Sequence, residues 1–261
     1  MDNAQLVLGD NIQTFVGRLN IVKTDTKLAF VTKRQKSKYV KEKRLILDGL
    51  KKNGVKLSKV RFFSYSEQEE YTNKLKKIFQ NDDSHFSFQH ILFTDNKLMV
   101  RKWIGGKKLS EVLSEGSYDF VKQYLGSIVR VHYSDLFYAD GWPSNIIVTP
   151  DSKLSRFDID LMVQDKEFEI AQAIFHIVSF SREPQIVSEI VASFIENNIA
   201  KEKYGKNKIR VYVKKFIKNR IAPFLSNKDD TLYFFGNLIK NTKKEHYMQV
   251  KQVLDSLSEL I

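Results

Sequence analysis

The 261-residue sequence has no cysteine, four prolines and eleven glycines, and it lacks any apolar run near the ~20 residues of a membrane-spanning helix. The absence of cysteine excludes disulfide bonds and Cys-based metal sites. Its five histidines show no His-Glu-x-x-His or similar metal-binding spacing. The first eleven residues are acidic and lack the charged-then-apolar pattern of a secretory signal. Together these absences favour a cytoplasmic protein.

Positive charge is the main feature of the composition: 43 Lys and Arg against 31 Asp and Glu give a net charge of +12. Such a surface favours anionic partners, namely a nucleotide, a nucleic acid, an anionic lipid or a phosphorylated glycan. A nucleic-acid-binding protein would explain the charge, but no stacking-aromatic motif or recognition-helix pattern is found, so we expect no nucleic-acid partner. With 42% hydrophobic residues, the chain can form one or two compact domains with a core.

Polar residues recur at fixed spacing in the stretch from Tyr138 to Leu161. They are, in order, Asp140, Asn145, Asp158 and Asp160. Two short apolar runs, 146–148 and 154–157, flank a turn at 150–153 and predict a β-hairpin. The pattern therefore indicates a polar loop, a hairpin, and an acidic residue that the hairpin returns to the loop.

This residue set suits phosphoryl transfer. That reaction needs a carboxylate to orient the attacking hydroxyl and receive its proton. It also needs an amide oxygen and a second carboxylate to hold Mg²⁺ against the nucleotide phosphates. A surface turn is the simpler explanation of any one aspartate, since loop acids usually solvate or cap. The combination of spacings favours phosphoryl transfer.

The stretch resembles the catalytic and metal-binding loops of the protein-kinase-like superfamily, where D-x-x-x-x-N, a hairpin and D-F-G follow one another. The FDID sequence at 157–160 is more similar to the second motif of small-molecule and glycolipid kinases, such as the lipopolysaccharide kinases that phosphorylate Kdo or heptose. The resemblance implies an α+β, two-lobed protein-kinase-like fold. A small antiparallel-sheet N-lobe with one main helix, at 1–102, would bind the nucleotide. A mostly helical C-lobe, at 103–261, would carry both loops.

The resemblance also implies a role for each polar residue. Asp140 would be the catalytic base or the acid that orients the hydroxyl. Asn145 and Asp158 would hold Mg²⁺, and Asp160 would be a further ligand or a loop stabiliser.

The N-terminal part adds two expected nucleotide-binding residues. Three short strands are expected over residues 11–35, and the resemblance matches Lys33 to the lysine that contacts the α- and β-phosphates of ATP. A helix is expected over 37–53, and its only glutamate, Glu42, would pair with Lys33. An ordinary strand-end lysine and an exposed helical glutamate are the alternatives. A glycine-rich loop is absent, so the phosphates must be covered differently.

Apolar residues at three- to four-residue spacing predict helices in the C-terminal half. They are expected over residues 118–133, 168–180, 185–197, 209–221 and 242–260. A hinge between the lobes is expected at 103–110, and the resemblance implies that backbone groups of 100–103 bind the adenine. Arg101 and Lys102 stand where the family often has an acidic and an aromatic residue. A helix or a loop insertion is expected over 71–80.

The expected activity is transfer of the γ-phosphate of ATP to a sugar or glycolipid hydroxyl, with Mg²⁺ as cofactor. A choline- or aminoglycoside-type kinase is the alternative within this class. A protein Ser/Thr kinase is disfavoured because the loop lysine, the glycine loop and an A-P-E motif are all absent. A pseudokinase is favoured by the missing glycine loop and disfavoured by the complete Asp-Asn-Asp set. The run 201–220, with nine Lys and Arg, is either a solvated helix face or a contact with anionic lipid.

Overall fold

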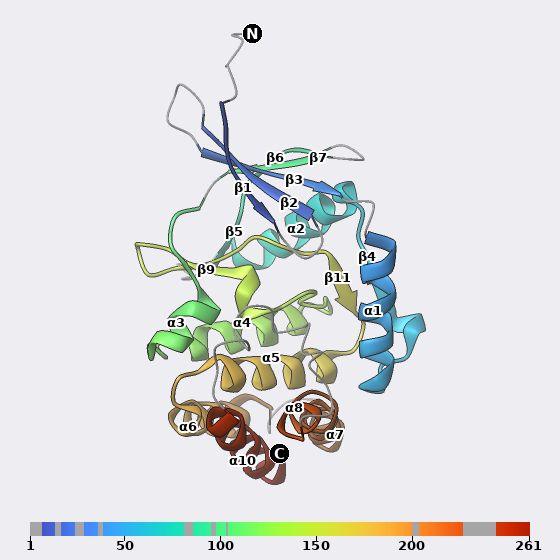
Figure 1. Ribbon diagram of the computed structural model, residues 1–261, viewed down its shortest axis with the longest axis vertical. Coiled ribbons are helices and arrows are strands. Elements are labelled where there is room, and N and C mark those ends of the chain that lie inside the picture. The colour runs from blue at the N-terminus through green and yellow to red at the C-terminus, as the bar shows by residue number, and fades with distance from the viewer. Residues whose placement is uncertain are drawn as a thin grey trace.

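Two lobes are stacked along the long axis of the molecule, a β-sheet at one end and a layer of helices at the other (Figure 1). The computed structural model describes residues 7–13, 17–23, 29–35, 39–80, 86–94, 98–102, 104–199, 204–226 and 244–261. Only the backbone is described up to residue 42 and at residues 45, 93, 98 and 199. The predicted α+β, two-lobed fold is confirmed.

The N-terminal sheet has five strands in the order β1-β2-β3-β7-β6, with all neighbours antiparallel. The strands are β1 (Val7–Gln13), β2 (Gly17–Lys23), β3 (Ala29–Gln35), β6 (Ile91–Thr94) and β7 (Leu98–Lys102). Apolar and polar residues alternate along Arg18–Ile21, as expected of a strand with one buried face. β2 and β3 lie where the sequence predicts strands, whereas β1 begins at Val7 and overlaps the predicted range 11–35 only at residues 11–13.

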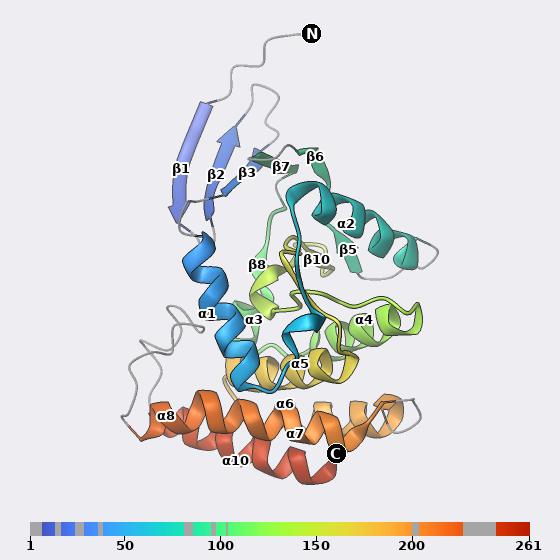
Figure 2. The same cartoon turned by 90° about the vertical axis from the view of Figure 1, so that its right-hand side faces the viewer.

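Two α-helices lie among the described residues between β3 and β6. The first, α1 (Tyr39–Lys52), is the helix predicted over 37–53. It runs down the side of the molecule toward the second lobe (Figure 2), where Asn219 donates a hydrogen bond to the Lys52 carbonyl at 3.0 Å. The second, α2 (Tyr65–Phe79), begins earlier than predicted, because Ser64 and Glu67 form a capping box. It is α2 that packs beside the sheet, where Thr94 of β6 donates to Glu69 at 2.7 Å.

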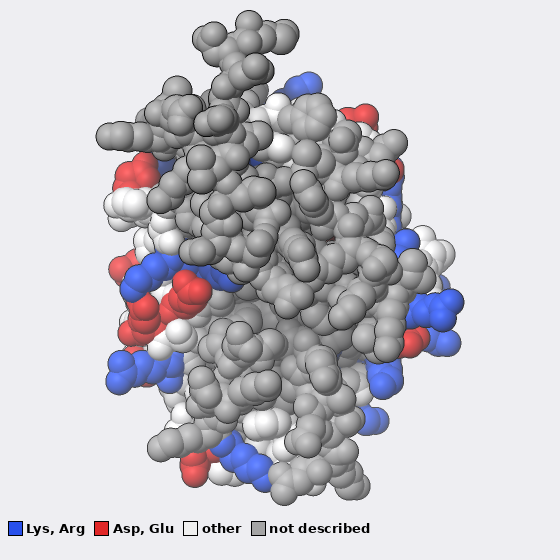
Figure 3. All heavy atoms as spheres, turned by 45° about the horizontal axis from the view of Figure 1, so that its top comes forward, with Lys and Arg blue, Asp and Glu red and all other residues white. Residues whose placement is uncertain are grey.

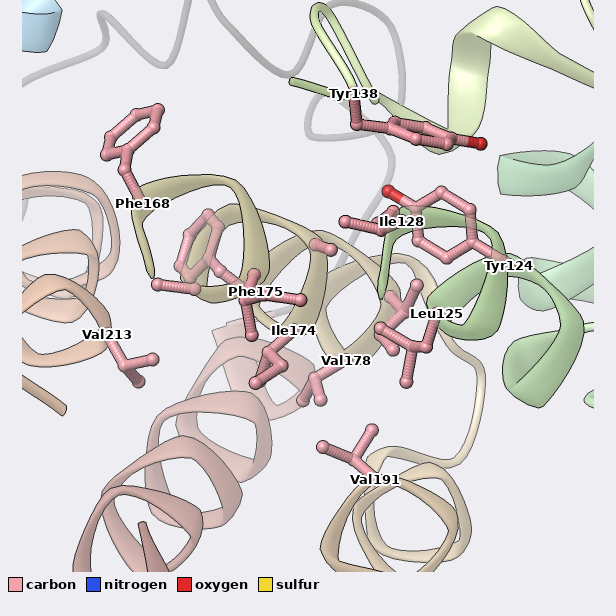
Figure 4. Close-up of a cluster of buried hydrophobic side chains, with 14 of the residues drawn as sticks. Tyr124, Leu125, Ile128, Tyr138, Phe168, Ile174, Phe175, Val178, Val191 and Val213 are labelled. Carbon is pink, nitrogen blue, oxygen red and sulfur yellow. The ribbon is translucent and has the colours of Figure 1, made fainter. Parts of the chain in front are cut away.

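The second lobe is mostly helical. Its helices are α3 (Leu109–Glu115), α4 (Val121–Tyr133), α5 (Lys166–Phe180), α6 (Pro184–Phe194), α7 (Lys206–Phe216), α8 (Ala222–Leu225) and α10 (Lys244–Leu260). Single π-helical turns, Ile195–Ile199 and Ile217–Ile221, continue α6 and α7. The central helix α5 is buried along most of its length, and its Val178 lies between Leu125 of α4 and Val191 of α6 (Figure 4), while its Phe175 stacks on Phe216 of α7. Each such side chain contributes ~1.5–3 kcal/mol through burial.

Short strands join distant parts of the chain next to the polar loop. A four-stranded sheet has the order β5-β10-β9-β8. Its strands are β5 (Phe86–Phe88), β8 (Lys107–Lys108), β9 (Ile146–Val148) and β10 (Leu154–Arg156), so the predicted hairpin is confirmed as β9 and β10. A separate pair joins β4 (Val60–Phe62), after the 3₁₀ turn Leu57–Lys59, to β11 (Leu161–Val163).

In the part of the chain that the structure describes, every helix is too short or too polar to cross a membrane.

Candidate active site

The polar loop brings Asp140 and Asn145 into contact. The amide nitrogen of Asn145 donates to the Asp140 carbonyl at 3.1 Å and to its carboxylate Oδ2 at 3.0 Å. A short 3₁₀ helix, Pro143–Asn145, begins with proline, whose fixed φ suits a first helical position. The Asp140 amide donates to the Leu161 carbonyl at 2.6 Å, which attaches the loop to β11.

Strained backbone precedes the loop. Ala139 has φ 56° and Asp140 has φ 27°, both in the left-handed region that non-glycine residues rarely adopt. Such conformations cost on the order of 1–3 kcal/mol each and persist only where surrounding contacts hold them. The contacts that hold this segment come from the buried side chains of Glu169 and Arg156.

Two buried side chains of opposite charge form hydrogen bonds to the backbone N–H and C=O groups immediately before Asp140. The Glu169 carboxylate, on α5, accepts from the Tyr138 and Ala139 amides, each at 2.7 Å, and lies 2.7 Å from His132 Nε2. The Arg156 guanidinium, on β10, donates to the Tyr138 and Ala139 carbonyls and lies over the Tyr138 ring. Both side chains are buried, and charges there are tolerated only when they are paired and hydrogen-bonded.

Two buried tyrosines, Tyr124 and Tyr138, also pack beside the loop. The Tyr138 hydroxyl accepts from Ser127 at 2.9 Å, and the Tyr124 hydroxyl donates to the Gly141 carbonyl. Burial raises the pKa of Tyr138 to about 12, so its hydroxyl stays protonated. A Cβ at Gly141 would lie 2.6 Å from the Tyr138 ring, so the close approach of loop and ring requires glycine there. Figure 4 shows both tyrosine rings lying above the apolar core.

Trp142, also in the loop, packs against a buried histidine. Its ring lies 4.1 Å from that of His176, centroid to centroid. Burial is the main cause that lowers the pKa of His176 to about 3, and the Arg220 cation adds to it. His176 is therefore a neutral packing partner near pH 7.

The hairpin returns Asp158 to the loop. The Phe157 amide donates to the Asn145 carbonyl at 3.1 Å, which places the FDID segment beside the loop. Asp158 Oδ1 lies 3.4 Å from Nη2 of Arg101. Asp160 Oδ1 accepts from Gln68 Nε2 at 2.6 Å, and its carbonyl accepts from Phe63. Both acids therefore contact side chains from the N-terminal part of the chain.

The donor set suits a magnesium ion. Because the Asn145 amide nitrogen is used in hydrogen bonds to Asp140, its oxygen is the atom left for a metal, and Asp158 offers carboxylate oxygens. Amide and carboxylate oxygens are ligands that Mg²⁺ prefers. No cluster of three or more His, Cys, Asp or Glu suited to a metal occurs among the described residues, and the predicted set relies on an amide instead. The metal-binding roles stay predictions.

The predicted pair of Lys33 and Glu42 falls outside the described side chains. Lys33 lies on β3, opposite Leu19 and Met99, and Glu42 lies near the start of α1. Their pairing stays a prediction. Among the described side chains, the helix that reaches the FDID segment is α2, through Gln68.

Sequence reasoning missed four buried polar side chains that hold the site. They are Gln68, Arg101, Arg156 and Glu169. The available signal was weak: Arg156 interrupts the apolar run of the hairpin, and Glu169 lies between Phe168 and Ile170 at the start of a largely apolar helix. A charged residue in such a run indicates a buried partner, but only the fold identifies that partner.

Part of the chain is similar in sequence to a plant protein that is named a kinase. No protein-family model matches the chain. Protein ACTIVITY OF BC1 COMPLEX KINASE 3, chloroplastic, of Arabidopsis thaliana is 31% identical over 97 residues. The aligned region covers 33% of this chain, which spans only 14% of that protein. The structure titled as the complex of Rv3197 with erythromycin, from Mycobacterium tuberculosis, aligns at TM-score 0.43 and 11% identity over 98% of this chain and 74% of that chain. The two-lobed architecture and the relative that is named a kinase together support a kinase-like fold for this chain.

Proposed function

We propose that this chain is an ATP-dependent kinase that transfers the γ-phosphate to a hydroxyl of a sugar or glycolipid, such as a Kdo- or heptose-like acceptor. The observation that carries the proposal is the hydrogen-bonded Asp140–Asn145 pair, in a loop to which the hairpin returns Asp158. The relative that is named a kinase supports kinase-like activity. The choice of a sugar or glycolipid among non-protein acceptors rests on the FDID motif.

In the proposed reaction, the acceptor hydroxyl oxygen attacks the γ-phosphorus, the bond to the β-phosphate oxygen breaks, and ADP leaves. Asp140 orients the hydroxyl and receives its proton. Asn145, through its amide oxygen, and Asp158 would hold Mg²⁺, with Asp160 as a further ligand or a stabiliser. When bound, the metal neutralises charge on the phosphates.

Positioning accounts for most of the catalysis in this scheme, because phosphoryl transfer requires little covalent work from the protein. Glu169 and Arg156 fix the peptide groups immediately before Asp140. Asn145 then fixes its carboxylate. The strained backbone at Ala139 and Asp140 is held by these contacts, so the carboxylate is oriented before substrate binds.

The residues after Asp140 support a non-protein acceptor. Protein kinases usually have a leucine and a catalytic lysine where this chain has Gly141 and Trp142. Here Gly141 lies against Tyr138 and Trp142 packs on His176, so both positions serve the structure of the loop.

We also propose a role for each lobe and a location in the cell. Residues 1–102 would bind the nucleotide, with Lys33 and Glu42 near its phosphates, and residues 103–261 would carry the catalytic and metal-binding loops. The protein would act in the cytoplasm, with peripheral contact to anionic lipid at the inner membrane face through the basic run 201–220.

The test is phosphate transfer from labelled ATP to a panel of Kdo, heptose, choline, aminoglycoside and peptide acceptors. Asp140→Asn keeps the shape of the side chain and removes the base, so we expect kcat to fall by roughly 10²–10⁴-fold. Stabilisation by Mg²⁺ and ATP in thermal unfolding should remain. Asp151→Asn, at the exposed hairpin turn, is the matched control. Equal turnover of Asp140→Asn and wild type would remove Asp140 from its role, and turnover on peptides alone would reject the acceptor class.

A nucleotide-binding pseudokinase is the second candidate. The ion pair between Arg101 and Asp158 favours it, because the Arg101 guanidinium contacts the carboxylate that would otherwise bind Mg²⁺. It predicts thermal stabilisation by nucleotide with no transfer to any acceptor in the panel.

A further inference from the structure

A buried guanidinium lies beside the proposed metal-binding acid. The side chain of Arg101, on β7, is only 5% exposed, and its Nη2 is 3.0 Å from Gln68 Oε1 and 3.4 Å from Asp158 Oδ1. Its Nε also faces the Met99 sulfur at 2.7 Å. Arginine keeps its charge inside proteins, so this cation must be matched by nearby acceptors.

Gln68 fixes the direction of this contact. Its side-chain oxygen faces Arg101 and its side-chain nitrogen donates to Asp160, at 2.6 Å. Reversing the amide would set an N–H group against the guanidinium and an oxygen against a carboxylate, so one orientation satisfies both partners. Gln68 is 2% exposed and sits in the first turns of α2. The two acids of the FDID segment are thereby linked to α2 and β7.

Asp158 cannot pair with Arg101 and bind Mg²⁺ equally well at the same time. A divalent cation on Asp158 would lie within a few ångströms of the guanidinium, and like charges repel strongly where water is largely excluded. Asp158 is only 17% exposed, so solvent screens this repulsion weakly. Gln68 offers Arg101 a second acceptor, so the guanidinium can give up Asp158 without losing every partner.

We infer that Arg101 competes with Mg²⁺ for Asp158, so that loading of the metal requires the guanidinium to leave the carboxylate while Gln68 retains it. This inference rests on the proposed function, since it concerns the magnesium–nucleotide site. It makes Arg101 a positioning residue that sets how much Mg²⁺ the site requires.

The test is the Mg²⁺ concentration that gives half of the thermal stabilisation, at a fixed excess of a non-hydrolysable ATP analogue. Arg101→Met keeps the length of the side chain and removes the cation, so we expect the midpoint to fall about tenfold. Arg182→Met is the matched control, because it removes an exposed guanidinium from a part of the chain outside α2, β7 and the FDID segment. Its midpoint should equal that of wild type. A purely structural role of Arg101 would lower the melting temperature without moving the midpoint.

The outcomes separate this inference from the proposed function. If wild type gains no stability from Mg²⁺ and the analogue, the nucleotide site itself is wrong. If wild type responds and Arg101→Met has an unchanged or higher midpoint, only the competition is rejected. Should Arg101→Met fail to fold, a wild-type structure with Mg²⁺ and the analogue decides. Separation of Arg101 Nη2 and Asp158 Oδ1 beyond ~4 Å, the limit for an ion pair, supports the inference, and an intact contact overturns it.

Discussion

At the scale of single residues, Glu169 links the helical core to the loop. Its carboxylate accepts two loop amides and also contacts His132, whose other ring nitrogen lies 2.9 Å from the Tyr204 hydroxyl. A buried carboxylate with this many partners is costly to replace, because its removal leaves several polar groups unpaired.

Glu169→Ala should therefore lower the free energy of unfolding by ~3–5 kcal/mol. It should also lower transfer activity, since the loop before Asp140 loses its anchor. Denaturant unfolding measures the first effect. Glu115→Ala, an exposed glutamate paired with Lys107, should change stability by less than ~1 kcal/mol. Equal effects of the two substitutions would contradict the role of Glu169.

His176 predicts a pH dependence of stability. Its pKa is about 3 in the folded protein, against 6.5 for an unperturbed histidine. Below pH 6.5 the unfolded chain binds a proton here that the folded chain does not, so the free energy of unfolding falls as pH falls toward 3. The slope from this group reaches ~1.4 kcal/mol per pH unit.

His176→Phe, which keeps an aromatic ring against Trp142, should reduce the slope of stability against pH between about 6 and 4. Denaturant unfolding at a series of pH values measures it. His90→Gln, at an exposed histidine, serves as the control and should leave the slope unchanged. A His176→Phe slope equal to that of wild type would show that another group causes the acid sensitivity.

At the scale of elements, the start of α2 positions Gln68 for its contacts with Arg101 and Asp160. Ser64 and Glu67 cap this helix reciprocally, and the Arg61 guanidinium holds the pKa of Glu67 at about 2, so the carboxylate stays charged. The N-cap thus sits one turn before a side chain of the site.

Ser64→Ala should lower the free energy of unfolding by ~1 kcal/mol, the usual cost of losing an N-cap. It should also raise hydrogen exchange in the first turn of α2. Ser256→Ala, at an exposed serine on α10, is the matched control and should stay within ~0.5 kcal/mol of wild type. Unchanged exchange in Ser64→Ala would mean that tertiary packing alone holds the start of α2.

At the scale of the whole molecule, two lysines of the basic run 201–220 are engaged in ion pairs. Lys208 pairs with Asp165 and Glu167, and Lys214 pairs with Glu259. Described acidic and basic side chains also stand next to one another along the left edge of the face in Figure 3. Lys215 packs against Gly54, so the proposed lipid contact must use other basic residues of the run, such as Lys206 and the exposed Lys218.

The double substitution Lys206→Glu/Lys218→Glu should weaken binding to vesicles that contain anionic lipid by about tenfold or more, since each surface charge is worth ~1 kcal/mol. Co-sedimentation at low ionic strength measures this. Lys122→Glu/Lys153→Glu makes the same charge change at exposed sites elsewhere and should have a smaller effect. Equal losses in both variants would indicate a general charge effect, and no binding by wild type would leave α7 a solvated helix face.

The sequence by itself determined the elements whose signals are local. The hairpin around 150–153, the loop from Asp140 to Asn145 and the apolar helices all follow from turn residues and periodicity within short windows. The predicted limits failed for α2, because a capping box outweighed the weak apolar pattern before residue 71.

Only the tertiary structure decided which buried side chains hold the site. Gln68 and Asp160 are 92 positions apart, and Tyr138 and Glu169 are 31 apart. No short-range pattern encodes such contacts, because they depend on how helices and strands pack. The sequence alone therefore predicts which chemical groups the site contains. The buried side chains that hold those groups in place, such as Glu169 and Arg101, could be identified only from the packing of the two lobes.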